Sequence, residues 1–486
     1  MADSVQPAGE KPGEEKPGEE KPLLDADASR EPWGVDHLAR WVLNVYFRRV
    51  EVHGVEAIPR QGAVVFVGNH VNGLIDPAIL MAYLPRKSRF LGKSTLWNEI
   101  SLRLFLRWAA AIPVYRREDP GVDPSRNAST FARCHQALAA GGTIALFPEG
   151  RSHNEASIVP LKTGMARIVL DALRDYPGTD IAIVPVGLTF EDKTRFRSRL
   201  LVKVGTPIDP GVPVDEADQE AAWEQVRELT DRTYRGLEAV TLNYPSWDEA
   251  RLIEQAAEIY DRQAGGTVTE QELADAFDRR RAFIDGYEEL LAQCPEQVGA
   301  VADEVRIYDQ ELALFGLEDE EVAARYSRSY VWRSTLKALT VIAVRSPLGV
   351  IGTVMNVLPY RAVAWISRRL ADSPDVVSTY KIFPSLVLFP LTWVAWATAA
   401  GWAWGWTGGL AALFLAPISG YFAVRFHQRL DLFIGRAKAF FTLRKPGTAI
   451  AHLADRRRLV LRQVAELVQA WQRRRKIPAA GPTETT

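Results

Sequence analysis

The chain has 486 residues, too many for one simple domain, so we expect a central domain with added segments. Its 59 Lys and Arg residues balance 60 Asp and Glu residues, which argues against a nucleic-acid-binding protein. The two cysteines, Cys134 and Cys294, lie far apart in the sequence and have no metal-ligand spacing. We therefore expect a reducing compartment, no disulfide framework and no structural zinc.

Residues 1–32 contain the repeat GEKPGEEKP and are rich in Glu, Lys, Pro and Gly. Such a segment cannot bury enough apolar surface to offset chain entropy, so we expect a disordered tail. It also lacks the apolar stretch of a signal peptide, which predicts that the following domain stays in the cytoplasm. Residues 33–48 place apolar side chains at helical spacing among arginines. They predict an amphipathic helix that either packs on the core or lies in a membrane interface.

Between residues 50 and 207, strand-like apolar runs alternate with helical segments. This alternation predicts an α/β domain, over residues 33–214, with a mixed, largely parallel sheet flanked by helices. Polar residues on the loops after the strands would then meet at one edge of the sheet. His70, Arg116 and Glu149 all fall at such strand ends.

The stretch VVFVGNHVNGLIDP, residues 64–77, is a strand-like run followed by a turn. Asp76 precedes Pro77 and an apolar-periodic segment, which predicts that Asp76 is the N-cap of a helix. Histidine can take a proton from a hydroxyl group when a carboxylate fixes its ring, and Asp76 is close enough in sequence to His70 to do so. The alternative is that Asp76 is only a cap and His70 only a polar turn residue.

A second stretch, TIALFPEGRS at residues 143–152, again runs from a strand into a turn. The turn contains Glu149 and Gly150 and is followed by Arg151. Free backbone N–H groups beside a cation suit a phosphate or a carboxylate. The alternative is an ordinary strand-to-helix connection with a solvated arginine.

These two stretches, with Ile112 to Arg116 between them and Ile183 to Gly187 after them, resemble the glycerolipid acyltransferase family, over residues 50–207. The resemblance implies the glycerolipid acyltransferase fold, and it implies that His70 takes the proton of an acceptor hydroxyl while Asp76 orients the imidazole. The activated oxygen would attack an acyl thioester directly. It further implies that Arg116 and Arg151 hold the acceptor phosphate, that Glu149 shapes this site and that Gly150 permits the turn. Arg117 competes with Arg116 for that role.

Five residues, Val71 to Ile75, separate His70 from Asp76, where the common form of the family has four. The longer spacing resembles the branch that acylates glycerol 3-phosphate or dihydroxyacetone phosphate, with acyl-CoA or acyl-carrier protein as donor and with no cofactor or metal. A 1-acylglycerol 3-phosphate or other lysophospholipid acceptor is the alternative within the family. The alternative from outside the family's chemistry is that the protein is a catalytically silent membrane scaffold. A serine hydrolase is not supported, because the sequence has no Gly-x-Ser-x-Gly elbow.

Gly92-Lys93-Ser94 mimics the end of a phosphate-binding P-loop, but the required first glycine is replaced by Lys87. We therefore exclude a nucleotide triphosphate site. Lys93, with Lys87 and Arg89, either attracts a phosphate-bearing substrate or forms a solvated basic face.

Residues 215–330 predict a helical region in which we find no chemistry. Residues 382–424 contain no Asp, Glu, Lys or Arg and are long enough for two transmembrane helices, with a break expected between Gly401 and Gly409. Because basic residues flank both ends, we expect a membrane hairpin whose ends lie in the cytoplasm. The alternative is a buried hairpin in a large soluble core.

The apolar segment from Leu336 to Pro359 is interrupted by Arg345 and Pro347, which favours an interfacial or re-entrant segment within a membrane-associated region, residues 331–440. Residues 455–476, in the C-terminal segment 441–486, predict a basic amphipathic helix that is either attracted to anionic lipid or simply solvated. The sequence thus predicts a multi-pass protein of the cytoplasmic membrane, with its α/β domain facing the cytoplasm.

Overall fold

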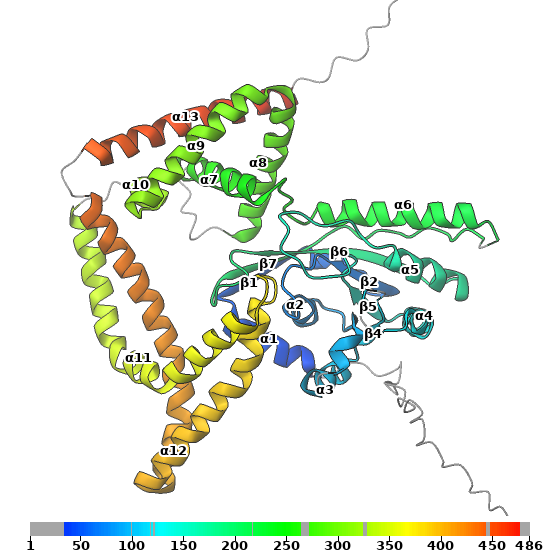
Figure 1. Cartoon of the computed structure of the whole chain (residues 1–486), viewed down its shortest axis with the longest axis horizontal. Helices are drawn as coiled ribbons and strands as arrows, with labels where there is room; N and C mark the ends of the chain where they lie inside the picture. Colours follow the sequence, from blue (N-terminus) through cyan, green and yellow to red (C-terminus); the bar gives the residue numbers. More distant parts are fainter. Residues whose placement is uncertain are drawn as a thin grey trace, which may run out of the picture.

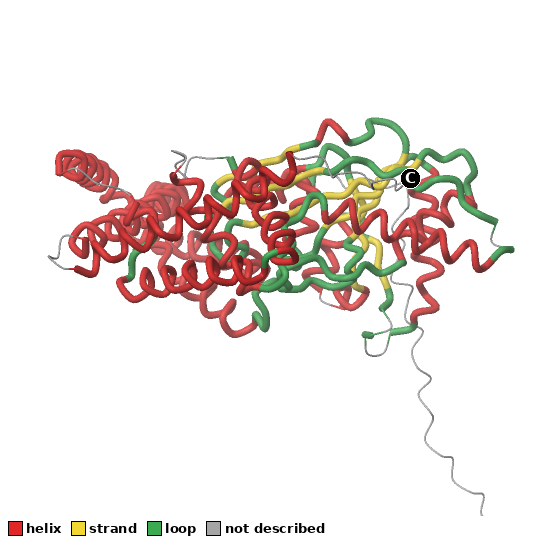
Figure 2. The backbone as a smooth tube through the Cα atoms, turned by 90° about the horizontal axis from the view of Figure 1, so that it is seen from above, coloured by secondary structure: helices red, strands yellow, loops and turns green. Residues whose placement is uncertain are grey.

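The computed structural model describes residues 34–476, apart from residues 99, 117, 120–121, 216, 264–271, 324–327 and 444–447. The predicted tail of residues 1–32 and Arg117 lie outside this part of the chain. An α/β domain comes first and a long series of helices follows (Figure 1). The strands gather in one part of the molecule, and helices alone make up the other part (Figure 2).

The α/β domain contains a seven-stranded sheet in the order β1-β7-β6-β2-β5-β3-β4. All neighbouring strands are parallel except β6 and β7, which confirms the mixed, largely parallel sheet. The strands are β1 (Arg49–His53), β2 (Ala63–Gly68), β3 (Ser88–Lys93), β4 (Ile112–Val114), β5 (Thr143–Leu146), β6 (Ile181–Phe190) and β7 (Arg199–Val204).

Helices cover both faces of the sheet. Successive side chains of β2 point to opposite faces, so the strand packs against both helical layers. Phe66 packs toward α1 (Val35–Tyr46) and α2 (Ile75–Tyr83). Val65 packs toward the other layer. That layer consists of α4 (Asn127–Ala139), α5 (Gly164–Asp175) and α6 (Gln219–Glu238), whereas α3 (Ile100–Trp108) immediately precedes β4. Helix α6 thus completes the sheet domain, although it lies in the segment predicted as a separate helical region.

Helix α1 has two apolar faces. Val35 and Leu43 are buried in the core beside the sheet. Leu38, Trp41 and Val45 on the other face are exposed, Trp41 by 60%. The helix therefore packs on the core and also presents apolar side chains at the surface.

A group of helices follows the sheet domain, and the last helix that the structure describes, α13, packs against the earlier helices of this group. Val460 on α13 shares a core with Leu252 and Tyr308. Arg456 of α13 pairs with Glu304, and Arg457 pairs with Asp319. The apolar face of α13 therefore packs on protein. The helices are α7 (Trp247–Gln263), α8 (Leu273–Gln293), α9 (Pro295–Phe315), α10 (Asp319–Ala323) and α13 (Thr448–Lys476).

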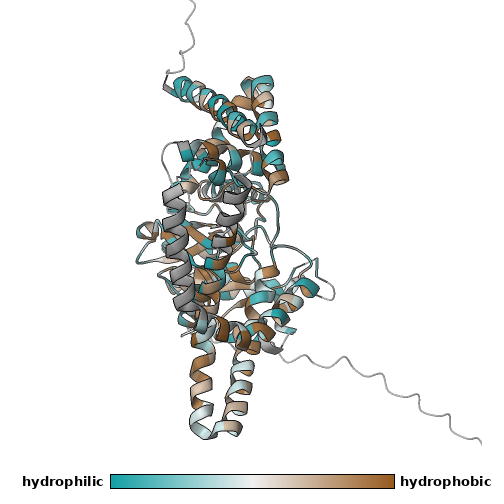
Figure 3. Cartoon of the chain, turned by 90° about the vertical axis from the view of Figure 1, so that its left-hand side faces the viewer, coloured by the Kyte–Doolittle hydropathy of each residue, from teal (hydrophilic) through white to brown (hydrophobic). Residues whose placement is uncertain are grey.

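Helix α12 (Val377–Leu443) breaks into two arms at Trp404 and Gly405, where the backbone leaves helical geometry. Gly405 has a φ of 74°, which glycine adopts at little cost. Gly401 and Gly409 face each other across the break, since a Cβ on Gly401 would lie 3.7 Å from the Gly409 Cα. The break falls within the predicted range, and the two arms form a hairpin that projects beyond the described domains (Figures 1 and 3).

The backbone of helix α11 (Arg328–Leu370) stays helical through Pro347 and Pro359. The interfacial or re-entrant placement expected for residues 336–359 stays a prediction. The helix packs along α12. Residues 347–370 and 377–430 are each long and apolar enough to cross a membrane, judged by length and composition alone. Large apolar side chains on the hairpin are open to the surroundings; Trp402, for example, is 92% exposed.

Candidate active site

The candidate site lies where β2 and β5 end. These strands are parallel neighbours, with Val67 paired to Leu146, so the loops that follow them leave the sheet at the same edge. The backbone N–H of His70 donates to Glu149 Oε1 at 3.2 Å. The His153 N–H donates to the His70 carbonyl at 3.0 Å. The two predicted motif loops are therefore tied together at His70.

His70 and Asp76 form the pair that their spacing suggested, with 3.0 Å between His70 Nδ1 and Asp76 Oδ2. The same oxygen also accepts the Asn72 N–H at 2.7 Å. The prediction that Asp76 is the N-cap is wrong, because α2 begins at Ile75 with Leu74 as its N-cap residue. The tight turn that bonds the Ile75 N–H to the Asn72 carbonyl starts the helix early and turns Asp76 inward.

The His70 ring stacks on Phe147, with 4.3 Å between ring centroids and 17° between planes. Its side chain is 16% exposed, whereas that of Asp76 is fully buried. Because the carboxylate can only accept, Nδ1 carries the proton in this pair and Nε2 keeps its lone pair. His70 is thereby arranged as a base that one face of the site can reach.

Asn69 anchors the turn that presents His70. Its side-chain amide donates to the Leu188 carbonyl at 3.1 Å and accepts from the Leu188 N–H at 2.7 Å. The neighbouring Gly187 lies so close to the turn after α6 that a Cβ there would sit 1.8 Å from the Val240 carbonyl oxygen. The predicted block at residues 183–187 therefore supports the site through β6.

Glu149 is almost completely buried, and both of its oxygens contact protein. Oε1 binds the His70 N–H, and Oε2 accepts from His153 Nε2. His153 Nδ1 accepts the Glu155 N–H at 3.1 Å, which leaves the ring proton on Nε2. Glu149 thus positions the His70 loop. Our sequence reasoning missed His153, and its place four residues after Glu149 was the available signal.

Gly150 and Arg151 lie close to the turn that carries Arg116. Gly150 has a φ of 79°, and a Cβ there would lie 3.0 Å from Cε of Lys162. Lys162 extends past Gly150 and pairs with Glu118 at 2.5 Å. This hydrogen bond lowers the pKa of Glu118. It links the Gly150 turn to the segment just after Arg116.

Arg116 is half-buried, whereas Arg151 is exposed. Within the described part of the chain, no hydrogen bond or ion pair holds either guanidinium. Both are therefore able to bind an anion.

Lys93 ends β3 and pairs with Asp119 at 3.0 Å. Asp119 is largely buried in the turn after Arg116, so the charge of Lys93 is already balanced there. Lys87 directly precedes β3 and Arg89 is its second residue, so four to six residues of strand, roughly 13–20 Å, separate them from Lys93. Lys93 therefore lies at the other end of the strand from Lys87 and Arg89.

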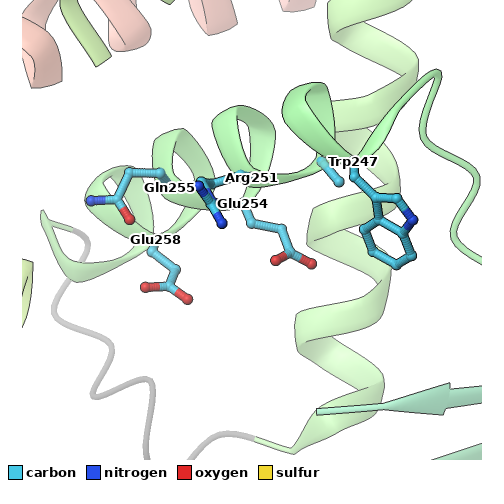
Figure 4. A pocket seen from close by; sticks show the side chains of 6 residues that line it. Trp247, Arg251, Glu254, Gln255 and Glu258 are labelled. Atoms are coloured by element: carbon cyan, nitrogen blue, oxygen red, sulfur yellow. The ribbon is translucent and has the colours of Figure 1, made fainter. Parts of the chain in front are cut away.

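A separate surface pocket lies on α7 (Figure 4). None of its lining residues belongs to the His70 or Glu149 loops. Its connection to the site is indirect, through Trp247 Nε1, which donates to the Asn154 carbonyl at 2.7 Å. The lining residues are Trp247, Ala250, Arg251, Glu254, Gln255 and Glu258.

A histidine oriented by a buried carboxylate can deprotonate a hydroxyl group. The described contacts leave the guanidinium groups of Arg116 and Arg151 able to bind an anion.

Two family models match the chain. The model described as "Acyltransferase" matches residues 49–189, and "Glycerol-3-phosphate acyltransferase 2 C-terminal domain" matches residues 252–473. The second match corrects our expectation that the resemblance ends near residue 207.

Curated relatives agree with these models. An uncharacterized acyltransferase of Schizosaccharomyces pombe is 22% identical over 88% of this chain and 80% of its own length. Glycerol-3-phosphate O-acyltransferase 1 of Saccharomyces cerevisiae is 24% identical over 55% of this chain, and the match spans only 36% of the yeast enzyme. Among solved structures, the 1-acyl-sn-glycerophosphate acyltransferase PlsC of Thermotoga maritima aligns with a TM-score of 0.29 and 18% identity, over 41% of this chain and 77% of that one. The two matched models and the yeast relatives support the glycerolipid acyltransferase family for this chain.

Proposed function

We propose that this protein is a membrane-bound O-acyltransferase that moves a fatty acyl chain from acyl-CoA or acyl-carrier protein to glycerol 3-phosphate or dihydroxyacetone phosphate. The observation that carries the proposal is the His70–Asp76 pair at the end of β2. The names of the yeast relative and of the C-terminal family model support glycerol 3-phosphate as acceptor, as does the five-residue spacing.

His70 Nε2 takes the proton of the acceptor hydroxyl as the oxygen attacks the thioester carbonyl carbon. Asp76 holds the ring and stabilises the imidazolium that forms. The tetrahedral intermediate collapses, the carbon–sulfur bond breaks, and the thiolate takes the proton from His70. The acyl ester is formed in one transfer, so no covalent enzyme intermediate is needed.

Arg116 and Arg151 hold the acceptor phosphate through charge-assisted hydrogen bonds. The link between Lys162 and Glu118 supports this role, since it joins the two turns that carry the arginines. Gly150 gives room for Lys162, and Glu149 keeps His70 in place. Lys93 contributes by holding Asp119 in the Arg116 turn.

The α12 hairpin anchors the enzyme in the cytoplasmic membrane with both ends and the α/β domain in the cytoplasm. Its exposed apolar surface and the basic residues on both flanks support this arrangement. The exposed apolar face of α1 fits the same membrane surface. Such an enzyme would leave its acylated product in the bilayer.

The test is acyl transfer by the purified full chain in phospholipid vesicles. Labelled acyl-CoA is offered with glycerol 3-phosphate, dihydroxyacetone phosphate or 1-acylglycerol 3-phosphate, and His70→Ala is compared with His135→Ala. His135 is a matched control, because its Nδ1 also pairs with a carboxylate, that of Asp175 at 2.7 Å, but it lies on α4 away from the site. We expect acyl transfer to glycerol 3-phosphate or dihydroxyacetone phosphate. The transfer rate should fall by about 10²–10⁴-fold in His70→Ala and stay unchanged in His135→Ala.

Transfer to 1-acylglycerol 3-phosphate alone would replace the proposed acceptor with a lysophospholipid. Retained activity in His70→Ala would overturn the assignment of the base. If neither acyl-CoA nor acyl-carrier protein supports any transfer, the protein is a silent scaffold and the proposal fails.

A further inference from the structure

The connection between α11 and α12, residues 371–376, reaches the loops of the candidate active site. Asp375 in this connection is 4% exposed. Its burial opposes ionisation, but hydrogen bonds from Ser152 and Ser373 and the charge of Lys193 hold its pKa below the usual value. Ser152 directly follows Arg151. Asp375 therefore contacts one of the two site loops from more than 200 residues away in the sequence.

Lys193 contacts the other site loop. Its ammonium donates to the Val71 carbonyl at 3.0 Å, and Val71 is the residue after His70. Burial lowers the pKa of Lys193, while the charges of Asp375 and then Asp76 oppose that shift. The negative charge of Asp375 thus offsets part of the cost of desolvating the partly buried ammonium that bonds the His70 loop.

The backbone of the same loop packs directly under the connection. A Cβ on Gly73 would lie 3.2 Å from the Asp375 carbonyl oxygen and 3.1 Å from Thr379 Oγ1. Gly73 also has a φ of 45°, which a side chain would strain. The loop between His70 and Asp76 is therefore shaped against residues 375–379.

Further contacts fix the start of α12 to the α/β domain. Tyr46 on α1 hydrogen-bonds Ser378 at 2.9 Å, and Ser378 Oγ donates to the Lys193 carbonyl. Lys381 donates to the Thr194 carbonyl at 2.5 Å. Ile382 is buried in the same core as Phe66. These contacts attach the candidate membrane hairpin to the segment that carries Lys193.

We propose that Asp375 is a positioning residue for the acyltransferase site: acting through Lys193 and Ser152, it fixes the His70 loop and the Arg151 loop against the base of the membrane hairpin. The C-terminal half of the chain thereby completes the geometry of the active site. This inference rests on the proposed function.

The test compares kcat and KM of Asp375→Asn with those of the full-length wild type in vesicles. Asn keeps the size of the side chain but removes the charge that faces Lys193. We expect kcat to fall by about 10²-fold, because a displaced base costs rate, with little change in the KM of either substrate. Asp372→Asn is the matched control, since it removes the same charge from an exposed position in the same connection.

A double-mutant cycle with Lys193→Met separates positioning from general weakening of the fold. If the two residues act as one unit, the double variant loses little more kcat than either single variant. Losses that multiply would mean that Asp375 does not act through Lys193 and would overturn the proposal. Thermal unfolding of each variant is measured in parallel. If Asp375→Asn does not fold, Ser152→Ala is used instead, because it removes the hydroxyl partner of the Asp375 carboxylate.

The outcomes distinguish the two proposals. An inactive wild type would remove the proposed function itself. Loss of activity in His70→Ala, with Asp375→Asn and Ser152→Ala both as active as Asp372→Asn, would leave the proposed function standing and refute the role of Asp375. A rise in KM without a fall in kcat would also refute it, because it would indicate substrate contact.

Discussion

In the α/β domain, large apolar side chains such as Phe66 and Leu200 are fully buried, and the polar groups of the site collect where strands end. In the hairpin the distribution is reversed. Trp402 and Phe414 are 92% and 64% exposed, while Asn356 of α11, which packs against the hairpin, is 7% exposed. In Figure 3 the projecting arms are coloured from brown to pale, with little of the strong teal that marks hydrophilic residues.

The reversal is what the proposed membrane anchor predicts for two regions in different surroundings. Water drives apolar side chains of the α/β domain inward, whereas helices in hydrocarbon gain nothing from burying them and are joined by polar contacts and small residues. A polar side chain therefore has a different meaning in each region. At the strand ends it is available for chemistry, and between the C-terminal helices it is a structural link.

The largest effect expected from this contrast is at Asp76. Asp76→Asn keeps the volume of the side chain but no longer stabilises a charged His70, so kcat should fall by about 10²–10⁴-fold. Acyl-transfer kinetics in vesicles provide the measurement. The control is Asp175→Asn, the carboxylate paired with His135. Equal losses in both variants would mean that the strand-end pair has no special role.

The sheet and the His70–Asp76 pair could be predicted because their determinants are local. Both features depend on residues that are close together in the sequence. These are the strand pattern of residues 64–68 and 143–147 and the short spacing between His70 and Asp76. The helix start was misplaced by two positions, because the Asn72 turn outweighs the capping preference of Asp76.

What could not be predicted depends on contacts across the fold. The pairing of Lys93 with Asp119 and the contact of Asp375 with Ser152 join residues on different elements, and no periodicity in the sequence signals them. The packing of α11 along α12 shows the same limit, because it joins residues far apart in the sequence.

A second prediction concerns Asp319, which links three helices in the C-terminal half. It accepts from Arg457 and from Tyr308, each at 2.8 Å, and pairs with Arg262 at 2.5 Å. Asp319→Asn would leave the largely buried guanidinium of Arg457 without its counter-charge and Arg262 with Glu258 alone, at a cost of about 3–5 kcal/mol in the free energy of unfolding. Chemical denaturation measures it, and the exposed Asp303→Asn is the control.

The same residue gives a dependence on pH. Burial disfavours the charged form of Asp319, but the hydrogen bonds from Arg457, Tyr308 and Arg262 hold its pKa below the ordinary value of 3.8. A carboxylate with a lowered folded pKa stabilises the fold above its unfolded pKa, and this contribution is lost as pH falls through the folded pKa. Acid unfolding of the wild type below pH 3.8 should therefore show a component that Asp319→Asn lacks. Identical acid profiles would contradict the assignment.

A third prediction applies one substitution to both regions. Phe66→Ala removes a fully buried ring from the sheet and should cost about 3–5 kcal/mol in the free energy of unfolding of the α/β domain. Phe414→Ala removes an exposed ring from the hairpin and should change that free energy by less than about 0.5 kcal/mol. Denaturation of both variants measures the difference, and similar costs would mean that the hairpin is packed like a soluble core.

The smallest effect is expected at Asn356, which joins α11 to both arms of the hairpin. Its Oδ1 accepts from Trp393 Nε1 at 2.9 Å, and its Nδ2 donates to the Ala416 carbonyl at 3.3 Å. Trp393 lies before the break at Gly405 and Ala416 lies after it. Because polar contacts between helices in hydrocarbon contribute about 0.6–2 kcal/mol, Asn356→Leu should destabilise the helix assembly by that amount.

Unfolding of the vesicle-reconstituted protein in a denaturing detergent, followed by tryptophan fluorescence, measures this loss. Val354→Leu is the control, since Val354 is 61% exposed on the same helix. If Asn356→Leu were instead to stabilise the assembly, apolar packing would be the force that joins these helices. The hairpin would then resemble the α/β domain in its energetics, and the contrast between the two regions would be one of exposure alone.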